Sequence, residues 1–236
     1  MKRLCLVLAL LAAVPAHAAR FRVVSPDLPP WAMESDGKPA GLGIELVQAM
    51  AQAAHDEISI QVLPRARAQK AVMDAADVLI VPLGRIPDRE ANFRWIIPLA
   101  PDRFVVVAKA DSPLKTIDDC RNQVVGMQIG GPGEAAAHAH GFEHIEPVSD
   151  EGLDAKKLLA GRIGCWLTGE LAARASLRAA GSNFAAVKEL GLVSENMMYL
   201  AGSKSLDDAA AKQWEAALAA IKANGSYERI MQEYQN

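Results

Sequence analysis

The sequence has few cysteines and few aromatic residues, and it lacks the motifs of the common metal and nucleotide sites. It contains three cysteines, and aromatic residues make up 5% of its 236 positions. There is no Cys-x-x-Cys pair and no Cys/His zinc spacing. A nucleophile elbow and a phosphate-binding loop are also missing. We therefore expect neither a metal nor another cofactor.

Positive charge is not in excess either. Lysine and arginine total 25 against 28 acidic residues, which gives a formal net charge of −3 at pH 7. Binding to nucleic acid or to an anionic membrane surface usually requires a basic surface. The charge balance therefore predicts no nucleic-acid partner.

Long apolar runs are absent except at the N-terminus. Lys2 and Arg3 precede an apolar run that continues to Val14, and the small-x-small triplet Ala16-His17-Ala18 follows. This layout predicts a cleaved secretory signal peptide over residues 1–18, since the run is shorter than the ~18 apolar residues of a membrane span. Cleavage would leave 23 basic and 28 acidic residues, a formal charge of −5. We expect a soluble, monomeric protein in the periplasm.

Two cysteines, Cys120 and Cys165, remain after that cleavage. They could form a disulfide in an oxidising compartment, or they could be two separate buried thiols. The sequence does not give their distance, so both interpretations stay open.

The first half of the chain alternates strand-like and helix-like segments. Residues 21–25, 58–64 and 78–83 are strand-like, and residues 44–54 and 65–76 have helical spacing of apolar residues. Nearly continuous apolar strands that alternate with helices predict a parallel sheet covered on both faces.

The second half repeats this alternation. A glycine-rich turn at 130–134 leads into an alanine-rich helix, and Asn224-Gly225 separates two C-terminal helices. The strand-like segments of this half are 102–110, 123–129, 163–168 and 196–203. Two similar β/α blocks suggest two lobes.

Four segments, in this order, resemble signatures of one protein family. They are LPPWAMESDGKPAGLGIELVQAMAQ, ADVLIVPLGRIPDREANFRWIIPLA, LLAGRIGCWLTGELAA and LAAIKANGSYERIMQEY. The chain thus resembles the periplasmic solute-binding proteins of the polar amino-acid ABC uptake family, the bacterial extracellular solute-binding proteins of family 3. The resemblance extends over nearly all of residues 19–236.

The resemblance implies the type 2 periplasmic-binding fold: two α/β lobes, each a mostly parallel sheet flanked by helices, with a ligand cleft between them. Lobe 1 would comprise residues 19–102 and 197–236, and lobe 2 residues 103–196. The implied function is capture of a small carboxylate-bearing solute, an amino acid or a related organic anion, in a cleft that closes on binding. An inner-membrane ABC permease would be the partner.

The implied carboxylate-binding arginine falls on Arg89, and a guanidinium matches a carboxylate with paired donors. Arg85 stands where the family usually has small hydroxyl residues, so it either replaces those donors or faces solvent. Arg65 and Arg67 follow a strand, and one of them could point into the cleft. Together these arginines would make the cleft positive. Trp31 falls on an aromatic that commonly stacks on the ligand, although a core tryptophan is the alternative.

The second lobe departs from the family pattern, because the family's ammonium-binding acid falls on Gly169. Thr168 or Glu170 could substitute for it, and Trp166 could belong to the cleft or to the core. The glycine-rich turn at Gly131 could offer amide donors to an anion. The complete predicted ligand set is Trp31, Arg67, Arg85, Arg89, Gly131, Trp166, Thr168 and Glu170.

Two other functions stay open. A few secreted relatives with this fold are dehydratases acting on cyclohexadienyl acids, and Glu170 would then be the acid or base. His138, His140 and His144 could instead form a metal site, although a solvated helix end is the simpler interpretation. We expect a binding protein without catalytic residues.

Overall fold

The computed structural model describes residues 20–129 and 133–235. The predicted signal peptide and Gly131 therefore lie outside the described residues. No helix among those described is long and apolar enough to cross a membrane.

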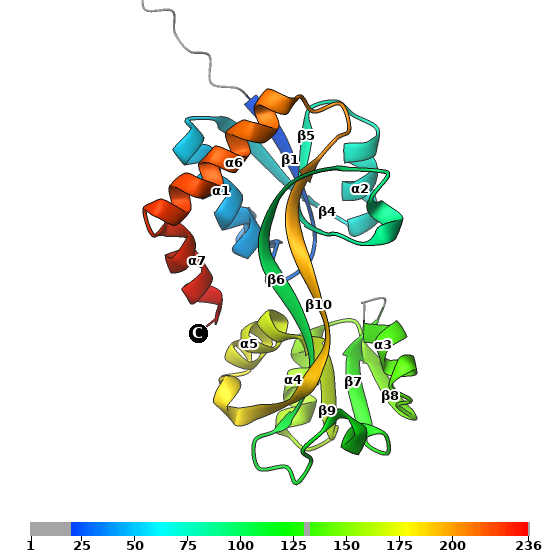
Figure 1. Cartoon of the computed structure of the whole chain (residues 1–236). Coiled ribbons are helices and arrows are strands. Elements are labelled where there is room, and N and C mark those ends of the chain that lie inside the picture. Colours follow the sequence, from blue (N-terminus) through cyan, green and yellow to red (C-terminus); the bar gives the residue numbers. More distant parts are fainter. Residues whose placement is uncertain (1–19, 130–132, 236) are drawn as a thin grey trace, which may run out of the picture.

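One sheet of eight strands runs through the whole molecule, in the order β4-β1-β5-β10-β6-β9-β7-β8. The long strands β6 and β10 pair antiparallel at its centre and join an upper and a lower half (Figure 1). A hairpin of β2 and β3 stands apart from this sheet. The strands are β1 (Arg20–Pro26), β2 (Met33–Ser35), β3 (Lys38–Ala40), β4 (Glu57–Leu63), β5 (Val78–Gly84), β6 (Arg94–Lys109), β7 (Val124–Gln128), β8 (His144–Val148), β9 (Cys165–Gly169) and β10 (Val187–Gly202).

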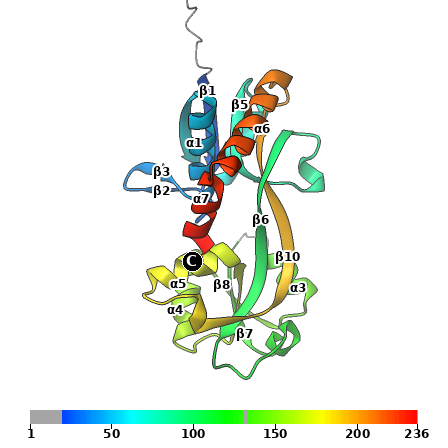
Figure 2. The ribbon, with the colours of Figure 1, turned by 60° about the vertical axis from the view of Figure 1, so that its left-hand side comes forward.

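Helices flank both halves. In the upper half, α1, α2, α6 and α7 surround the parallel strands β4, β1 and β5, and in the lower half α3, α4 and α5 surround β7, β8 and β9 (Figures 1 and 2). The helices are α1 (Leu42–Ala54), α2 (Arg65–Met73), α3 (Gly133–Ala139), α4 (Glu151–Leu159), α5 (Glu170–Ala179), α6 (Asp208–Ala223) and α7 (Ser226–Gln235), with short 3-10 helices η1 (Pro87–Arg89), η2 (Ile117–Cys120) and η3 (Phe184–Ala186). The structure thus has the predicted α/β fold with two halves.

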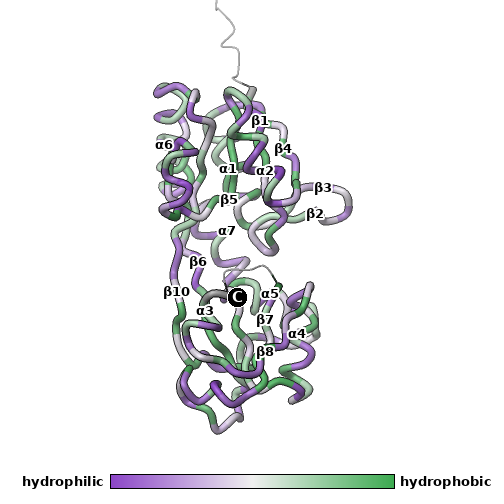
Figure 3. The backbone as a smooth tube through the Cα atoms, turned by 90° about the vertical axis from the view of Figure 1, so that its right-hand side faces the viewer, coloured by the Kyte–Doolittle hydropathy of each residue, from purple (hydrophilic) through white to green (hydrophobic). Residues whose placement is uncertain are grey.

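The apolar pattern explains where the core lies. Strand β5 is buried from Val78 to Leu83 because helices cover both of its faces, whereas the apolar residues of α1 recur at helical spacing and form one buried stripe. Hydrophobic stretches gather inside both halves, around α1 and β7 among others (Figure 3). Two core clusters lie mainly in the upper half and two in the lower half. The lobe boundaries at 102/103 and 196/197 stay a prediction.

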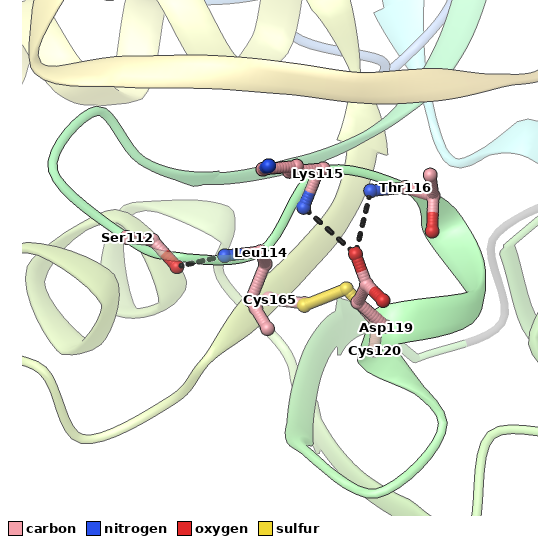
Figure 4. Close-up of a disulfide and its surroundings, with 7 residues drawn as sticks. All are labelled: Ser112, Leu114, Lys115, Thr116, Asp119, Cys120 and Cys165. Atoms are coloured by element: carbon pink, nitrogen blue, oxygen red, sulfur yellow. Dashed lines mark hydrogen bonds between the residues drawn. A yellow bond between two sulfur atoms is a disulfide. The ribbon is translucent and has the colours of Figure 1, made fainter.

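Cys120 and Cys165 form a disulfide, which closes the question that the sequence left open. Their Cα atoms are 6.1 Å apart, within the range that a disulfide spans. The bond joins the end of η2 to the start of β9 (Figure 4). A capping box between Thr116 and Asp119 supports η2, so the disulfide joins two regular elements of the lower half.

The crossing strands are longer than the sequence predicted. Strand β6 begins at Arg94 rather than near Asp102, and β10 begins at Val187 rather than at Asn196. Pro98 and Pro101 interrupt the missed part of β6, and polar residues and Gly191 interrupt that of β10. The two strands nevertheless pair with each other along almost their whole length.

Candidate functional site

A cleft of about 680 Å³ lies where the upper and lower halves meet. This volume suits a small molecule. Its lining comprises Pro26, Asp27, Leu28, Pro29, Pro30, Trp31, Arg65, Gln69, Pro82, Leu83, Gly84, Ile86, Arg89, Asp102, Phe104, Gln128, Ser149, Asp150, Glu151, Gly169, Ala172, Ala175, Ser176, Asn196 and Met198.

The lining follows from the sheet topology. Pro26, Gly84, Gln128 and Gly169 are the last residues of β1, β5, β7 and β9, and all four contribute to the cleft. The carboxyl ends of strands in open α/β sheets are the usual place for a ligand. The strands of the two halves therefore direct their following loops into one shared space.

Arg89 reaches the cleft from η1, directly after β5. Its Nη1 donates a hydrogen bond to the carbonyl oxygen of Gly84 at 3.0 Å, which fixes the guanidinium against the strand end. Burial lowers the pKa of Arg89, and the positive charge of nearby Arg65 lowers it further. Both arginines line the cleft, and within the described part of the chain neither forms an ion pair with a carboxylate.

Arg65 and Arg67 lie two residues apart at the start of α2, and they differ in position. Arg65 is half-buried and lines the cleft, whereas Arg67 is exposed and is not part of the lining. The cleft thus takes one arginine from this pair.

Arg85 lies outside the cleft lining. Its Nε and Nη2 donate to the two carboxylate oxygens of Glu90 at 2.7 and 3.1 Å. The guanidinium carbon is 5.3 Å from the ring centroids of both Trp95 and Tyr199. Glu90 and the rings of Trp95 and Tyr199 therefore hold the Arg85 side chain outside the cleft lining.

Trp31 belongs to both the cleft wall and the core. Its side chain is 2% exposed and packs in the upper core cluster. Its Nε1 donates a hydrogen bond to Oδ1 of Asp102 at 3.2 Å. Through this bond, the Pro-rich loop after β1 orients a carboxylate on the crossing strand β6.

Asp102 and Glu151 are cleft residues that the sequence reasoning did not single out. Glu151 is the first residue of α4, directly after β8, and its Oε2 accepts a hydrogen bond from Thr168 Oγ1 at 2.6 Å. Burial raises the pKa of Asp102 to about 6 and that of Glu151 to about 7. The signal that could have identified Glu151 was its place after residues 144–148, which form strand β8 and which the sequence analysis did not identify as strand-like. For Asp102, on the crossing strand, no such local signal exists.

The predicted lobe 2 residues lie mostly outside the cleft. Trp166 and Thr168 are fully buried, Trp166 in a core cluster and Thr168 behind Glu151. Glu170 accepts hydrogen bonds from Arg174 at 2.8 Å and from Arg103, and it lines a separate hollow of about 200 Å³ next to α7.

The expected positive cleft is not what the structure has. The lining contains two arginines, Arg65 and Arg89, and four carboxylates. These are Asp27, Asp102, Asp150 and Glu151. The cleft lining is therefore mixed in charge, with more carboxylates than guanidiniums.

The histidines of the predicted metal alternative lie on different elements. His138 is in the last turn of α3, His144 begins β8, and the ring of His140 stacks on Phe142. Within residues 20–129 and 133–235 no group of three or more His, Cys, Asp or Glu side chains could hold a metal ion.

Comparisons with solved structures place the fold among substrate-binding domains. The chain superimposes on substrate-binding domain 2 of Lactococcus lactis GlnP in an open conformation with a TM-score of 0.75 and 15% identity, covering 92% of this chain and 96% of that one. The arginine-, lysine-, histidine-binding protein ArtJ of Geobacillus stearothermophilus matches with a TM-score of 0.69 and 16% identity, covering 91% and 94%. The ancestral amino acid-binding protein AncCDT-1, a precursor of cyclohexadienyl dehydratase, matches with a TM-score of 0.70 and 17% identity, covering 92% and 96%. At these low identities, the similarities show that the chain shares the fold of these proteins and nothing beyond it.

A comparison with curated protein sequences finds no significant match. The model of the bacterial extracellular solute-binding proteins, family 3, matches residues 22–236, which is nearly the whole chain. The sequence signatures, the two-halved sheet and this match agree. The protein belongs to the bacterial extracellular solute-binding proteins, family 3.

Proposed function

We propose that this protein captures a small carboxylate-bearing solute, an amino acid or a related organic anion, in the cleft between its two halves. It does so in the periplasm, after removal of residues 1–18, and delivers the solute to an ABC permease in the inner membrane. The family and the export signal support this setting.

The observation that carries the proposal is the pair of cleft arginines, neither of which forms an ion pair with a carboxylate of the described residues. Arg89 and Arg65 line the same space, and burial together with Arg65 lowers the pKa of Arg89. Two half-buried guanidiniums that line one cleft favour an anion between them. A ligand carboxylate, which accepts paired hydrogen bonds, fits this requirement.

Closure of the two halves would strengthen this contact. The two strands β6 and β10 connect the halves and also contribute Asp102, Phe104, Asn196 and Met198 to the cleft. A bend in these strands brings the lower wall toward the arginines and excludes water, which strengthens charge interactions.

The dehydratase alternative loses its predicted acid. Although burial acts to raise the pKa of Glu170, hydrogen bonds from Arg174 and Arg103 keep it below its usual range. A carboxylate held in this way is a poor proton donor at neutral pH. Glu170 also lies outside the cleft lining, so it does not face a ligand there.

The test is a thermal shift screen of the mature protein against the twenty amino acids and a set of dicarboxylates and aromatic acids. A ligand at 100 times its Kd adds about 2.7 kcal/mol. At roughly 2–4 °C per kcal/mol for a chain of this size, the Tm rises by about 5–10 °C.

Arg89→Ala should weaken binding of any hit by roughly 2–5 kcal/mol, because it leaves the ligand carboxylate without its partner. Arg67→Ala is the matched control, since Arg67 is an exposed arginine close by that does not line the cleft. Unchanged affinity in Arg89→Ala, or an equal loss in both variants, would contradict the proposal.

A further inference from the structure

The turn that carries Arg89 also carries a second arginine, which the proposed function does not use. Strand β5 ends at Gly84, η1 spans Pro87–Arg89, and β6 begins at Arg94. Arg89 lines the cleft, whereas Arg85 lies outside the lining. One short turn thus sends one arginine into the cleft and keeps the other out of it.

Two hydrogen-bonded links close this turn, and they join neighbouring residues. In the cleft, Nη1 of Arg89 donates to the carbonyl oxygen of Gly84 at 3.0 Å. Outside the lining, Nε and Nη2 of Arg85 donate to the two carboxylate oxygens of Glu90 at 2.7 and 3.1 Å. The first two residues of the turn are therefore tied to its residues 89 and 90.

Arg85 is itself held against two strands of the central sheet. Strand β10 lies between β5 and β6 (Figure 1). The guanidinium carbon of Arg85 is 5.3 Å from the ring centroids of Trp95 on β6 and Tyr199 on β10, and its backbone N–H donates to the carbonyl oxygen of Met197 at 3.3 Å. Aromatic rings attract a cation at this distance. Arg85 thus connects Glu90, late in the turn, to β6 and β10.

The exposure of this ion pair decides what it can do. The side chains of Arg85 and Glu90 are 42% and 46% exposed, and exposed ion pairs add little to the stability of a whole protein. A paired contact between a guanidinium and a carboxylate nevertheless fixes the relative position of its two residues. The hydrogen bonds from Arg85 lower the pKa of Glu90, so the contact persists at neutral pH. Its effect is therefore local, on the backbone of the adjacent Arg89.

We infer that Arg85 is a positioning residue: through Glu90 it holds the turn so that the guanidinium of Arg89 is presented to the cleft. This inference rests on the proposed function, which assigns the ligand carboxylate to Arg89. A guanidinium forms paired hydrogen bonds with a carboxylate only in a suitable orientation, and an orientation fixed before binding costs less entropy on binding. Arg85 thereby contributes to affinity without contacting the ligand.

The first test compares Arg85→Ala with Glu90→Ala, which change the charge in opposite directions. If only charge mattered, an anionic group would bind more weakly to Arg85→Ala and more tightly to Glu90→Ala. A positioning role weakens binding in both variants, by about 3- to 10-fold, as expected when one long side chain must be ordered on binding. The double variant should lose no more than either single variant, because all three lack the same link.

The probe is the compound that raises the Tm of the parent most among the twenty L-amino acids, succinate, glutarate and 3-phenylpropionate. Calorimetry measures its Kd. The matched control is Arg94→Ala, which removes an ion pair with Asp208 and a hydrogen bond to the carbonyl oxygen of Leu206 at 2.6 Å. Arg94 follows the same turn but holds α6 rather than residues 84–90. Its removal should leave the Kd within twofold.

Two readouts tie the effect to Arg89. Arg89→Lys keeps a cation but loses the paired donors, so in that background Arg85→Ala should weaken the probe less than twofold. The second readout is hydrogen exchange without any probe. The amides of Arg89 and Glu90 donate to carbonyl oxygens three residues earlier. These amides should exchange at least threefold faster in Arg85→Ala and at the parent rate in Arg94→Ala.

The outcomes separate the two proposals. Unchanged or tighter binding in Glu90→Ala refutes the positioning role while carboxylate capture stands. So does a loss in Arg85→Ala that is equally large in the Arg89→Lys background, and so does unchanged exchange of the two amides. If no compound of the panel binds to the parent, carboxylate capture fails, and the exchange rates alone then support or refute the hold of Arg85 on the turn.

Discussion

Asp154 carries the sharpest prediction about stability, because its carboxylate is completely enclosed. The residue is 0% exposed, and neither carboxylate oxygen has a hydrogen-bond partner in the described part of the chain. One oxygen lies 4.0 Å from the ammonium of Lys157, which also contacts Glu146 at 2.8 Å. It also lies so close to β7 that a Cβ on Gly126 would be 2.5 Å from it. The charged form of Asp154 is therefore poorly supported.

The cost of this arrangement depends on pH. Burial raises the pKa of Asp154 from 3.8 to about 7, against the opposing charge of Lys157. Between these two values the folded state binds more protons than the unfolded state, so stability falls as the pH rises from about 4 to 7. At 1.36 kcal/mol for each pKa unit, this rise corresponds to about 4 kcal/mol at pH 8, and relaxation around the ionised carboxylate leaves a cost of about 2–4 kcal/mol.

Asp154→Asn removes the charge and keeps the shape. The variant should be about 2–4 kcal/mol more stable than the parent at pH 8 and nearly equal to it at pH 4, where the parent carboxyl is already neutral. Urea unfolding at pH 4, 6 and 8 measures the free energy of unfolding of both proteins. Glu215→Gln, an exposed change on α6, should show no such trend. A variant that is less stable than the parent at pH 8 would show that Asp154 is ionised and stabilising, and would refute this reasoning.

Two further predictions concern the backbone and the disulfide. Replacing Cys120 and Cys165 together by alanine should lower the free energy of unfolding by about 4 kcal/mol, since the bond closes a loop of 45 residues in the unfolded chain. Denaturant unfolding with and without a reductant measures this loss. An unchanged free energy of unfolding in the double variant would argue against the bond. Gly41→Ala should lower stability by at least about 2 kcal/mol, because Gly41 has φ 119° and its new Cβ would lie 2.7 Å from the carbonyl oxygen of Trp31. Gly37→Ala, at φ 72° with open space around it, should cost only about 1–2 kcal/mol, and equal Tm losses for the two variants would contradict the steric explanation.

Much of the fold could be predicted from the sequence, because the signals that define it are local. The apolar run of β5 and the helical stripe of α1 appear where their periodicities predict them. Asn224 and Gly225 separate α6 from α7 as expected, and Gly225 adopts the positive φ of 77° that favours glycine. The order of four signatures also identified the family, which the match over residues 22–236 confirms.

The wall of the cleft could be predicted only in part, since it depends on contacts between distant residues. Trp31 and Asp102 are 71 positions apart, and Thr168 lies behind Glu151 at a separation of 17. Side-chain partners at such separations leave no periodic trace in the sequence. The carboxylates of the cleft lining were therefore missed, and a positive cleft was expected instead.

The arginines show the same division between sequence and tertiary structure. The sequence by itself determined that cations gather after β4 and β5, where strand ends meet a cleft. The sequence could not determine which of these arginines face the cleft. Tertiary structure decided that Glu90 and two rings hold Arg85 outside the lining and that Arg65, rather than Arg67, joins Arg89. The reason is physical: local propensities set where a strand or helix ends, whereas the direction of a long charged side chain follows the partners that folding brings within its reach.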